Sequence, residues 1–277
     1  MKRKHVIGIL APVDAGKTTL SESLLYLSGK IRKLGRVDNK DAFLDTYDLE
    51  KSRGITIFSK QAQFELSESE VILMDTPGHV DFSAEMERTL QILDYAILVV
   101  SGADGVQGHT KTLWKLLDVY DIPVFIFINK MDQPGTDRNR VLNQLKAQLS
   151  ENITEFDLID KTFYEASALC DEDLMDAFLE KDQIGDDLIK EAVMNRNVFP
   201  CYFGSALRLE GIDIFLEGLN LWTKEKIYPE AFSARIFKIS RDEQGNRLTH
   251  LKVTGGNLKV KDRSEEHTSE LQSRHNL

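Results

Sequence analysis

The segment that most restricts the fold of this chain lies near its start, where an apolar run ends in a glycine-containing turn and a helical pattern follows. Residues 6–11 are apolar, residues 11–18 read Ala-Pro-Val-Asp-Ala-Gly-Lys-Thr, and residues 18–27 have helical spacing. This order is that of a phosphate-binding loop, with alanine in place of the first glycine. Gly-Lys-Thr alone is also compatible with an ordinary helix start, but the strand before it and the helix after it favour the loop.

Such a turn aims successive backbone N–H groups at one point, beside the positive end of the following helix. Gly16 lets the backbone approach a phosphate without a Cβ in the way. Lys17 is expected to reach the β- and γ-phosphate oxygens, and the Thr18 hydroxyl to ligate Mg²⁺. The predicted phosphate-binding residues of this loop are Val13, Asp14, Ala15, Gly16, Lys17, Thr18 and Thr19.

Alternating apolar runs and helical patterns predict the fold class. The runs are apolar at successive positions, as in strands of a parallel sheet that is covered on both faces. Further strands are predicted at 71–74, 95–101, 123–128 and 199–203, with helices at 84–92, 110–120 and 139–149. Residues 61–66 alternate like an edge strand. We therefore predict an α/β fold, a P-loop domain whose mostly parallel sheet carries helices on both faces.

Looser, acidic sequence at residues 151–197 predicts a short insertion before the last core strand, with helices at 171–181 and 186–194. A helix at 213–222 is expected to close the first domain, residues 1–228, and Pro229 marks a linker. Residues 229–262 are expected to begin a truncated β-domain, with paired strands at 233–239 and 247–254 and a following one at 257–260. Residues 263–277 resemble the translation of a sequencing-library adapter; a natural polar tail is the alternative.

Composition limits which binding partners and which cellular compartment we expect for this chain. The net charge of −10 argues against a protein that coats DNA or RNA with a basic surface, although one local patch can still dock on a ribonucleoprotein. Cys170 and Cys201 lack metal-ligand spacing and are expected to be buried thiols of a reducing compartment. Apolar runs are too short for a signal peptide core or a membrane span. We expect a cytoplasmic protein with no DNA or membrane partner.

A second group of residues is predicted to hold the metal and the terminal phosphate. Asp75 ends an apolar strand and faces the crevice where such sheets bind ligands, so it is expected to hold Mg²⁺, through water. Gly78 can turn its N–H toward a γ-phosphate; a plain turn is the alternative for Asp-Thr-Pro-Gly. Thr56 is predicted to close over Mg²⁺ within a switch segment at residues 50–57, although threonine before a strand is common.

The base end of the site is predicted at residues 129–132, Asn-Lys-Met-Asp, after the apolar strand at 123–128. Asp132 can accept two hydrogen bonds from guanine N1–H and its exocyclic amine, a pair that adenine does not offer. Lys130 can cover the base plane, and Asn129 can tie this loop to the phosphate loop. The small residues at the end of the last strand can bring a backbone N–H to guanine O6, and the predicted residues are Ser205, Ala206 and Leu207. This set favours GTP over ATP.

Together, residues 14–19, 53–57, 75–79 with 81–82, and 129–132 resemble those of the translational GTPases, specifically elongation factor G and the ribosomal protection proteins that confer tetracycline resistance. The resemblance runs from Lys4 to about Asp262 and implies GTP and GDP as ligands, and the ribosome, its RNA and its proteins, as partner of the full-length parent. It also implies that His79 orients the attacking water once the ribosome engages, so turnover in isolation is expected to be slow.

The short insertion and the sequences at 21–26 and 211–213 are closer to the protection proteins, and residues 232–262 resemble the start of the family's second domain, a β-barrel. Pro12 departs from the usual histidine, and proline lacks an N–H. Domains that enter the decoding region are not in this sequence. The alternatives are an elongation factor G-like translocation factor without a resistance role and a nucleotide-binding fragment without productive hydrolysis.

Overall fold

The computed structural model describes residues 2–35, 60–76, 83–242 and 244–259. The predicted site residues Thr56, Gly78 and His79 lie outside these residues, as does the predicted adapter-derived tail at 263–277. The chain divides into two compact units, Met1–Lys226 and Ile227–Leu277, and each is described by itself.

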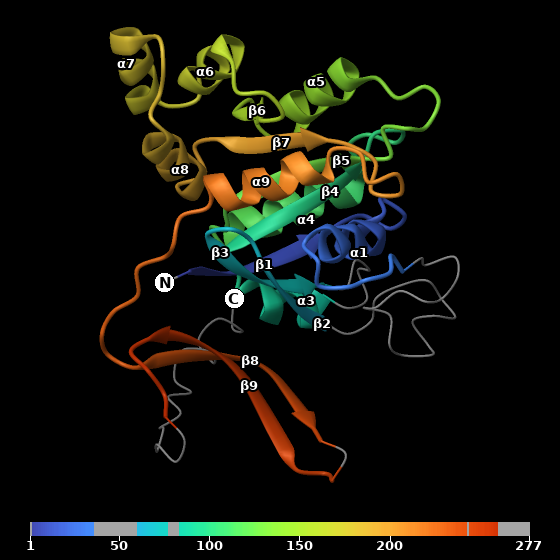
Figure 1. Cartoon of the computed structure of the whole chain (residues 1–277), viewed down its shortest axis with the longest axis vertical. Helices are drawn as coiled ribbons and strands as arrows, with labels where there is room; N and C mark the ends of the chain where they lie inside the picture. Colours follow the sequence, from blue (N-terminus) through green and yellow to red (C-terminus); the bar gives the residue numbers. More distant parts are fainter. Residues whose placement is uncertain (1, 36–59, 77–82, 243, 260–277) are drawn as a thin grey trace, which may run out of the picture. The chain divides into compact units, whose positions relative to one another are not determined.

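The first unit is built on one seven-stranded sheet in the order β2-β3-β1-β4-β5-β7-β6 (Figure 1). Every neighbouring pair is parallel except β2 and β3, which are antiparallel, so the predicted edge strand is confirmed. The strands are β1 (Arg3–Leu10), β2 (Lys60–Glu65), β3 (Ser69–Asp75), β4 (Tyr95–Ser101), β5 (Val124–Asn129), β6 (Ile153–Glu155) and β7 (Phe199–Phe203).

Helices connect the strands and cover the sheet, as the alternating sequence pattern predicts. Helices α1 and α9 contact each other on one face, and α4 packs against β4. The helices are α1 (Lys17–Leu27), α3 (Ser83–Leu90), α4 (Gly108–Val119), α5 (Arg138–Gln148), α6 (Lys161–Ala168), α7 (Glu172–Lys181), α8 (Asp186–Met194) and α9 (Ile212–Trp222). In the described part of the chain, no helix has the length and apolarity needed to cross a bilayer.

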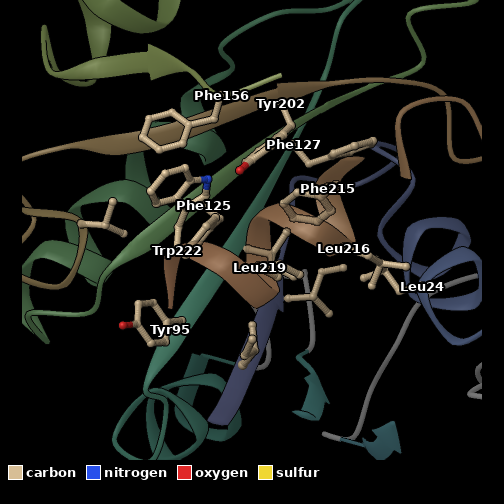
Figure 2. Packing of buried hydrophobic residues seen from close by; sticks show 14 of the residues in the cluster. Leu24, Tyr95, Phe125, Phe127, Phe156, Tyr202, Phe215, Leu216, Leu219 and Trp222 are labelled. Atoms are coloured by element: carbon tan, nitrogen blue, oxygen red, sulfur yellow. The ribbon is translucent and has the colours of Figure 1, made fainter. Parts of the chain in front are cut away.

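The core beneath α1 and α9 is rich in aromatic side chains (Figure 2). Phe125 and Phe127, two positions apart on β5, both join it, because side chains at alternate strand positions share one face. The ring of Phe127 lies 5.0 Å from that of Phe215 on α9, centroid to centroid. Trp222, at the end of the same helix, is only 2% exposed. Burial of these large rings fixes α9 on the sheet and thereby the loop that leads into it.

The predicted helices at 171–181 and 186–194 are confirmed as α7 and α8, but the insertion contains more regular structure than its sequence indicates. Strand β6 pairs in parallel with β7, so this segment extends the main sheet by one strand. Helix α6 follows, and Asp160 caps it by accepting a hydrogen bond from the Phe163 N–H at 3.0 Å. A strand of three residues is too short to show a period of two.

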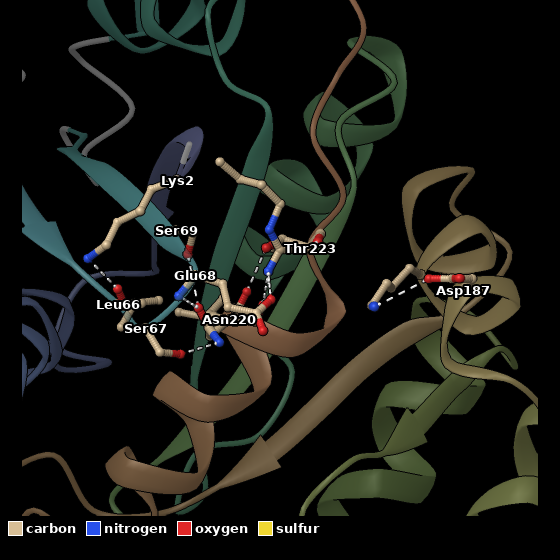
Figure 3. A network of polar contacts seen from close by, with 11 residues as sticks. Lys2, Leu66, Ser67, Glu68, Ser69, Asp187, Asn220 and Thr223 are labelled. Atoms are coloured by element: carbon tan, nitrogen blue, oxygen red, sulfur yellow. Dashed lines mark hydrogen bonds and ion pairs between the residues drawn. The ribbon is translucent and has the colours of Figure 1, made fainter.

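Polar contacts hold the far end of the sheet against the end of α9 (Figure 3). The Asn220 side chain accepts from the Glu68 N–H at 3.1 Å and donates to Ser67 Oγ at 2.8 Å, in the turn between β2 and β3. Arg3 donates to the carbonyls of Thr223 and Asn220 at 2.6 and 2.7 Å. These bonds satisfy carbonyls that the end of a helix leaves without partners.

Both cysteines are free thiols; Cys201 is buried, as expected, whereas Cys170 is only partly buried. Burial raises the pKa of both thiols, which favours their protonated form.

The second unit contains an antiparallel pair, β8 (Ser233–Arg241) and β9 (Arg247–Gly255), where two strands were predicted. The Asp242 carboxylate organises the connection by accepting from the N–H groups of Gln244 and Asn246 at 2.9 and 2.8 Å. The prediction of a strand at 257–260 is wrong for residues 257–259, and residue 260 lies outside the described residues. The chain turns at Gly256, whose φ of 56° is a left-handed conformation, and its N–H donates to the Pro229 carbonyl at 3.0 Å.

Candidate nucleotide-binding site

The parallel strands bring the predicted loops to one edge of the sheet. Strands β1, β3, β5 and β7 all point the same way, so the residues that follow them meet at the carboxyl edge, where open α/β sheets bind ligands. Asp75 lies beside Ile9 in the β1–β3 register, and Asn129 lies beside Ser101 in the β4–β5 register. Elements far apart in the sequence therefore contribute to one place.

The first loop, residues 11–16, leads from β1 into α1. Asp14 has a φ of 64° and Gly16 a φ of 91°, and the Ala15 N–H donates to the Pro12 carbonyl at 3.2 Å. Pro12 therefore takes part in the turn through its carbonyl, which its missing N–H does not affect. No residue in the described ranges accepts from the N–H groups of Asp14, Gly16 or Thr18. A helix start with several such donors is a suitable anion site.

Gly16 has two structural reasons to be glycine besides the phosphate. Its φ of 91° disfavours any residue with a Cβ. A Cβ there would also collide with Asn129 Nδ2 and lie 4.0 Å from Lys130 Cε, so the base-side loop closes directly over it. Sequence reasoning assigned this glycine to phosphate alone, because the approach of a residue more than a hundred positions away leaves no local pattern.

Lys17 and Asp75 meet at the start of α1 and the end of β3. The Lys17 ammonium forms an ion pair with Asp75 Oδ1, and their side chains are 10% and 0% exposed. The next residue along, Thr76, donates its hydroxyl to the Ile9 carbonyl at 2.7 Å, which fixes the end of β3. A hydroxyl at Thr18 and a carboxylate at Asp75 are oxygen donors of the kind that Mg²⁺ prefers. These residues therefore fit the predicted metal.

A ready-made protein cage for a metal is absent from the described residues, which contain no group of three or more His, Cys, Asp or Glu side chains. Mg²⁺ in nucleotide sites commonly takes one or two protein ligands and completes its shell with phosphate oxygens and water. The predicted ligands Thr18 and Asp75 match that arrangement; Thr56, the third, lies outside the described residues.

Asn129 joins three of the predicted loops. Its Nδ2 donates to the Ala15 carbonyl at 2.9 Å, and its Oδ1 accepts from the Ala206 N–H at 2.9 Å. The side chain is buried, with the residue 3% exposed. The expected tie between the base loop and the phosphate loop is therefore confirmed, and the same amide also holds the loop after β7.

The loop after β7 has a defined turn of its own. Ser205 and Glu210 exchange backbone hydrogen bonds, each at 3.0 Å. The Ala206 N–H is used by Asn129, whereas no described residue accepts from the Leu207 N–H. Among the three residues predicted to approach guanine O6, Leu207 therefore has the available donor, and its side chain is exposed.

Asp132 lies beside this turn. Lys130 adopts a φ of 63°, and the following Met131 N–H donates to the Gly204 carbonyl at 3.1 Å, so the two loops are joined through their backbones. The Asp132 side chain is 14% exposed, and its Oδ2 lies 3.3 Å from Arg208 Nε. Sequence reasoning missed Arg208; the only available signal was a cation directly after Ser-Ala-Leu.

A second arginine supports the end of β7. Arg138 forms ion pairs with Glu155 and Asp157, and its guanidinium lies 4.2 Å from the centroid of the Phe203 ring. Asp157 in turn accepts from the Phe203 N–H at 3.4 Å. Burial raises the pKa of Asp157, and the attraction of Arg138 opposes this shift. These contacts fix the strand immediately before the Gly204 turn.

The fold and these contacts define a P-loop domain of the guanine-nucleotide-binding class. Residues 2–225 match the family model described as "Elongation factor Tu GTP binding domain". The chain belongs to this family and carries a GTPase domain of the translation-factor type.

Curated relatives with similar sequences are tetracycline resistance proteins. The chain is 35% identical to TetP of Clostridium perfringens, over 95% of this chain and 44% of the relative. It is 37% identical to TetO of Campylobacter jejuni and 38% identical to TetW of Butyrivibrio fibrisolvens, each over 92% of this chain and 43% of the relative. The chain thus spans less than half the length of the curated relatives it matches.

A crystal structure of a protein from Thermus thermophilus superimposes with a TM-score of 0.83 at 23% identity. The match covers 94% of this chain and 46% of that one. At this identity the likeness supports the fold.

Proposed function

We propose that the chain binds GTP with Mg²⁺ and hydrolyses it when its full-length parent engages the ribosome, and that this parent is a ribosomal protection protein acting against tetracycline. The observation that carries the nucleotide proposal is the bridge made by Asn129, which holds the phosphate loop and the base loop in one site. The names of the curated relatives support the resistance role. Ribosomes lie in the cytoplasm, which is where we expect the parent.

Each part of the site has an assigned task in this proposal. The free N–H groups of the first loop and the Lys17 ammonium bind phosphate oxygens. Thr18 and Asp75 would hold Mg²⁺, which supplies charge neutralisation at the phosphates when bound. Asp132 recognises the guanine edge, and the Leu207 N–H donates to O6. His79 orients the attacking water, as the family resemblance implies.

Lys17 changes partners in this scheme. Its ammonium now neutralises Asp75 in a buried ion pair. Phosphate oxygens offer it stronger acceptors, and a cation beside Thr18 would take over the Asp75 charge. The exchange leaves no buried charge without a counterion, which is necessary because an unpaired buried charge costs several kcal/mol.

Single-turnover GTP hydrolysis, measured with and without ribosomes, tests the enzymatic part. The reaction should be slow for the protein alone and at least about a hundredfold faster with ribosomes when the full-length version is used, on the scale by which partners activate other GTPases. Equal rates in both conditions would favour a nucleotide-binding fragment without productive hydrolysis.

Expression of a full-length version in a sensitive host separates the resistance role from the alternative. Raised tolerance to tetracycline supports ribosomal protection. Unchanged tolerance, together with ribosome-stimulated hydrolysis, favours the elongation factor G-like translocation factor without a resistance role.

A further inference from the structure

The cation beside the predicted guanine-reading carboxylate is a feature that the assigned tasks do not use. Arg208 Nε lies 3.3 Å from Asp132 Oδ2, with side-chain exposures of 58% for the arginine and 14% for the aspartate. Within the described residues, Asp132 is the one charged group that the Arg208 side chain contacts, and Arg208 is the one cation that contacts Asp132. The contact therefore links two loops through a single pair of side chains.

The turn that carries Arg208 does not need this side chain to form. The Ser205–Glu210 backbone pair closes the turn, and the Arg208 N–H donates to the Ser205 carbonyl at 3.2 Å. Ala206 is separately held by Asn129. The Arg208 side chain is more than half exposed. The backbone of the turn thus forms without the Arg208 side chain, whose one ion pair within the described residues is with Asp132.

We propose that Arg208 is a positioning residue for guanine recognition, holding the Asp132 carboxylate in the orientation that meets the N1–H and the exocyclic amine of the base. The inference rests on the proposed function and adds a specificity-determining residue to it.

The chemistry of the carboxylate makes this arrangement possible. Each carboxylate oxygen can accept two hydrogen bonds. Oδ2 can therefore keep its contact with Arg208 while it accepts from the base, and Oδ1 remains available for the second donor. Without Arg208 the Asp132 carboxylate can rotate about its terminal bond. A base that forms two hydrogen bonds to the carboxylate is more sensitive to that rotation than a base that forms one.

Loss of the Arg208 contact should change the discrimination between bases as well as the affinity for GDP. Guanine offers both N1–H and an exocyclic amine, whereas hypoxanthine offers N1–H alone. Loss of Arg208 should weaken the bidentate contact to guanine more than the single contact to hypoxanthine. The ratio of GDP affinity to IDP affinity should consequently fall, which simple loosening of the fold would not produce.

The experiment titrates the 277-residue chain with GDP and IDP in the presence of Mg²⁺, comparing wild type with Arg208→Ala, Arg208→Lys and Arg208→Gln. Arg208→Ala should bind GDP about two- to fivefold more weakly, the range expected for an exposed ion pair. Its GDP/IDP ratio should fall by a similar factor. Arg208→Lys should retain most of the GDP affinity and of the GDP/IDP ratio because it keeps the charge, and Arg208→Gln should not.

Arg247→Ala is the matched control, because Arg247 is an exposed arginine in the second unit. An Asp132→Asn background provides a second test, with XDP as the ligand. There the carboxylate is gone, so Arg208→Ala should change XDP affinity less than about twofold, and the two substitutions should be strongly non-additive.

The outcomes separate this inference from the function on which it rests. If wild type binds neither GDP nor IDP, the proposed function fails. If wild type binds GDP and Arg208→Ala matches it in both GDP affinity and GDP/IDP ratio, the inference is overturned while the proposed function stands. Tighter GDP binding by Arg208→Ala would also overturn it, because Arg208 would then compete with the base.

Discussion

Replacement of Asn129 by alanine removes two buried hydrogen bonds at once. The Ala15 carbonyl loses its donor and the Ala206 N–H loses its acceptor, both at positions where water has little access. A buried hydrogen bond contributes about 1 kcal/mol, and a buried polar group left without a partner costs about 1–3 kcal/mol. We therefore expect the free energy of unfolding of the first unit to fall by about 2–4 kcal/mol.

Urea unfolding followed by tryptophan fluorescence measures this loss in the relevant unit. The two tryptophans of the chain, Trp114 and Trp222, are 9% and 2% exposed, and both belong to the first unit. The midpoint should fall with little change in the slope m, since the fold and the surface exposed on unfolding stay the same. GDP affinity should fall at least about tenfold, because a loss of about 1.4 kcal/mol in loop alignment suffices for that factor.

Asn195→Ala is the control. Asn195 is exposed and its side chain makes no hydrogen bond within the described residues, so its replacement should change stability by less than about 0.5 kcal/mol. If Asn129→Ala lowered the free energy of unfolding no more than Asn195→Ala does, the bridge that Asn129 makes between the loops would not contribute to stability. The assignment of a structural role to this bridge would then be refuted.

The other predictions concern the same site and one buried phenol. Gly16→Ala should reduce GDP affinity at least about tenfold and destabilise the chain by about 1–2 kcal/mol through its positive φ alone. Gly108→Ala, at the first position of α4 with open space around it, should have neither effect. Equal changes in GDP affinity and melting temperature for the two variants would contradict the steric argument. Asp132→Asn should shift preference from GDP to XDP, and unchanged GDP affinity would remove the base-recognition argument. His79→Ala should bind GTP normally but lose ribosome-stimulated hydrolysis, and retained stimulation would exclude the catalytic assignment. Burial raises the pKa of Tyr95 to about 12, so the phenol of the unfolded chain loses its proton first, near pH 10. The free energy of unfolding should therefore fall as pH rises from about 10 to about 12. If the urea midpoint of a Tyr95→Phe variant fell as steeply over this range, another group would be responsible.

Elements whose side chains are all buried could be predicted well from the sequence. Strands β4 and β7 have the predicted bounds, and all of their residues are buried, so both appear in the sequence as runs that are apolar at nearly every position. Strand β6 was not predicted, since its three residues form a strand only because β7 provides the partner. The wrong strand prediction after Gly256 has a similar cause, because apolar and polar alternation over three or four residues does not determine pairing.

Within the site, the residue types were predictable and several of their contacts were not. The Asn-Lys-Met-Asp motif indicated that Asn129 would tie two loops, and the amide also contacts a third, at Ala206. The clash that forbids a Cβ at Gly16 and the contact of Arg208 with Asp132 arise from loops that approach each other only in the folded chain. Such contacts depend on long-range geometry, for which a single sequence carries no periodic or local signal.

Competition binding of GDP and ADP to the same protein, with Mg²⁺ present, tests most directly whether these loops form one guanine-nucleotide site. GDP should displace a fluorescent GDP analogue at concentrations at least about a thousandfold below those at which ADP does, as expected when a site built to accept hydrogen bonds from the guanine edge meets a base that lacks those donors. Displacement by GDP and ADP at similar concentrations, or the absence of nucleotide binding, would contradict this expectation.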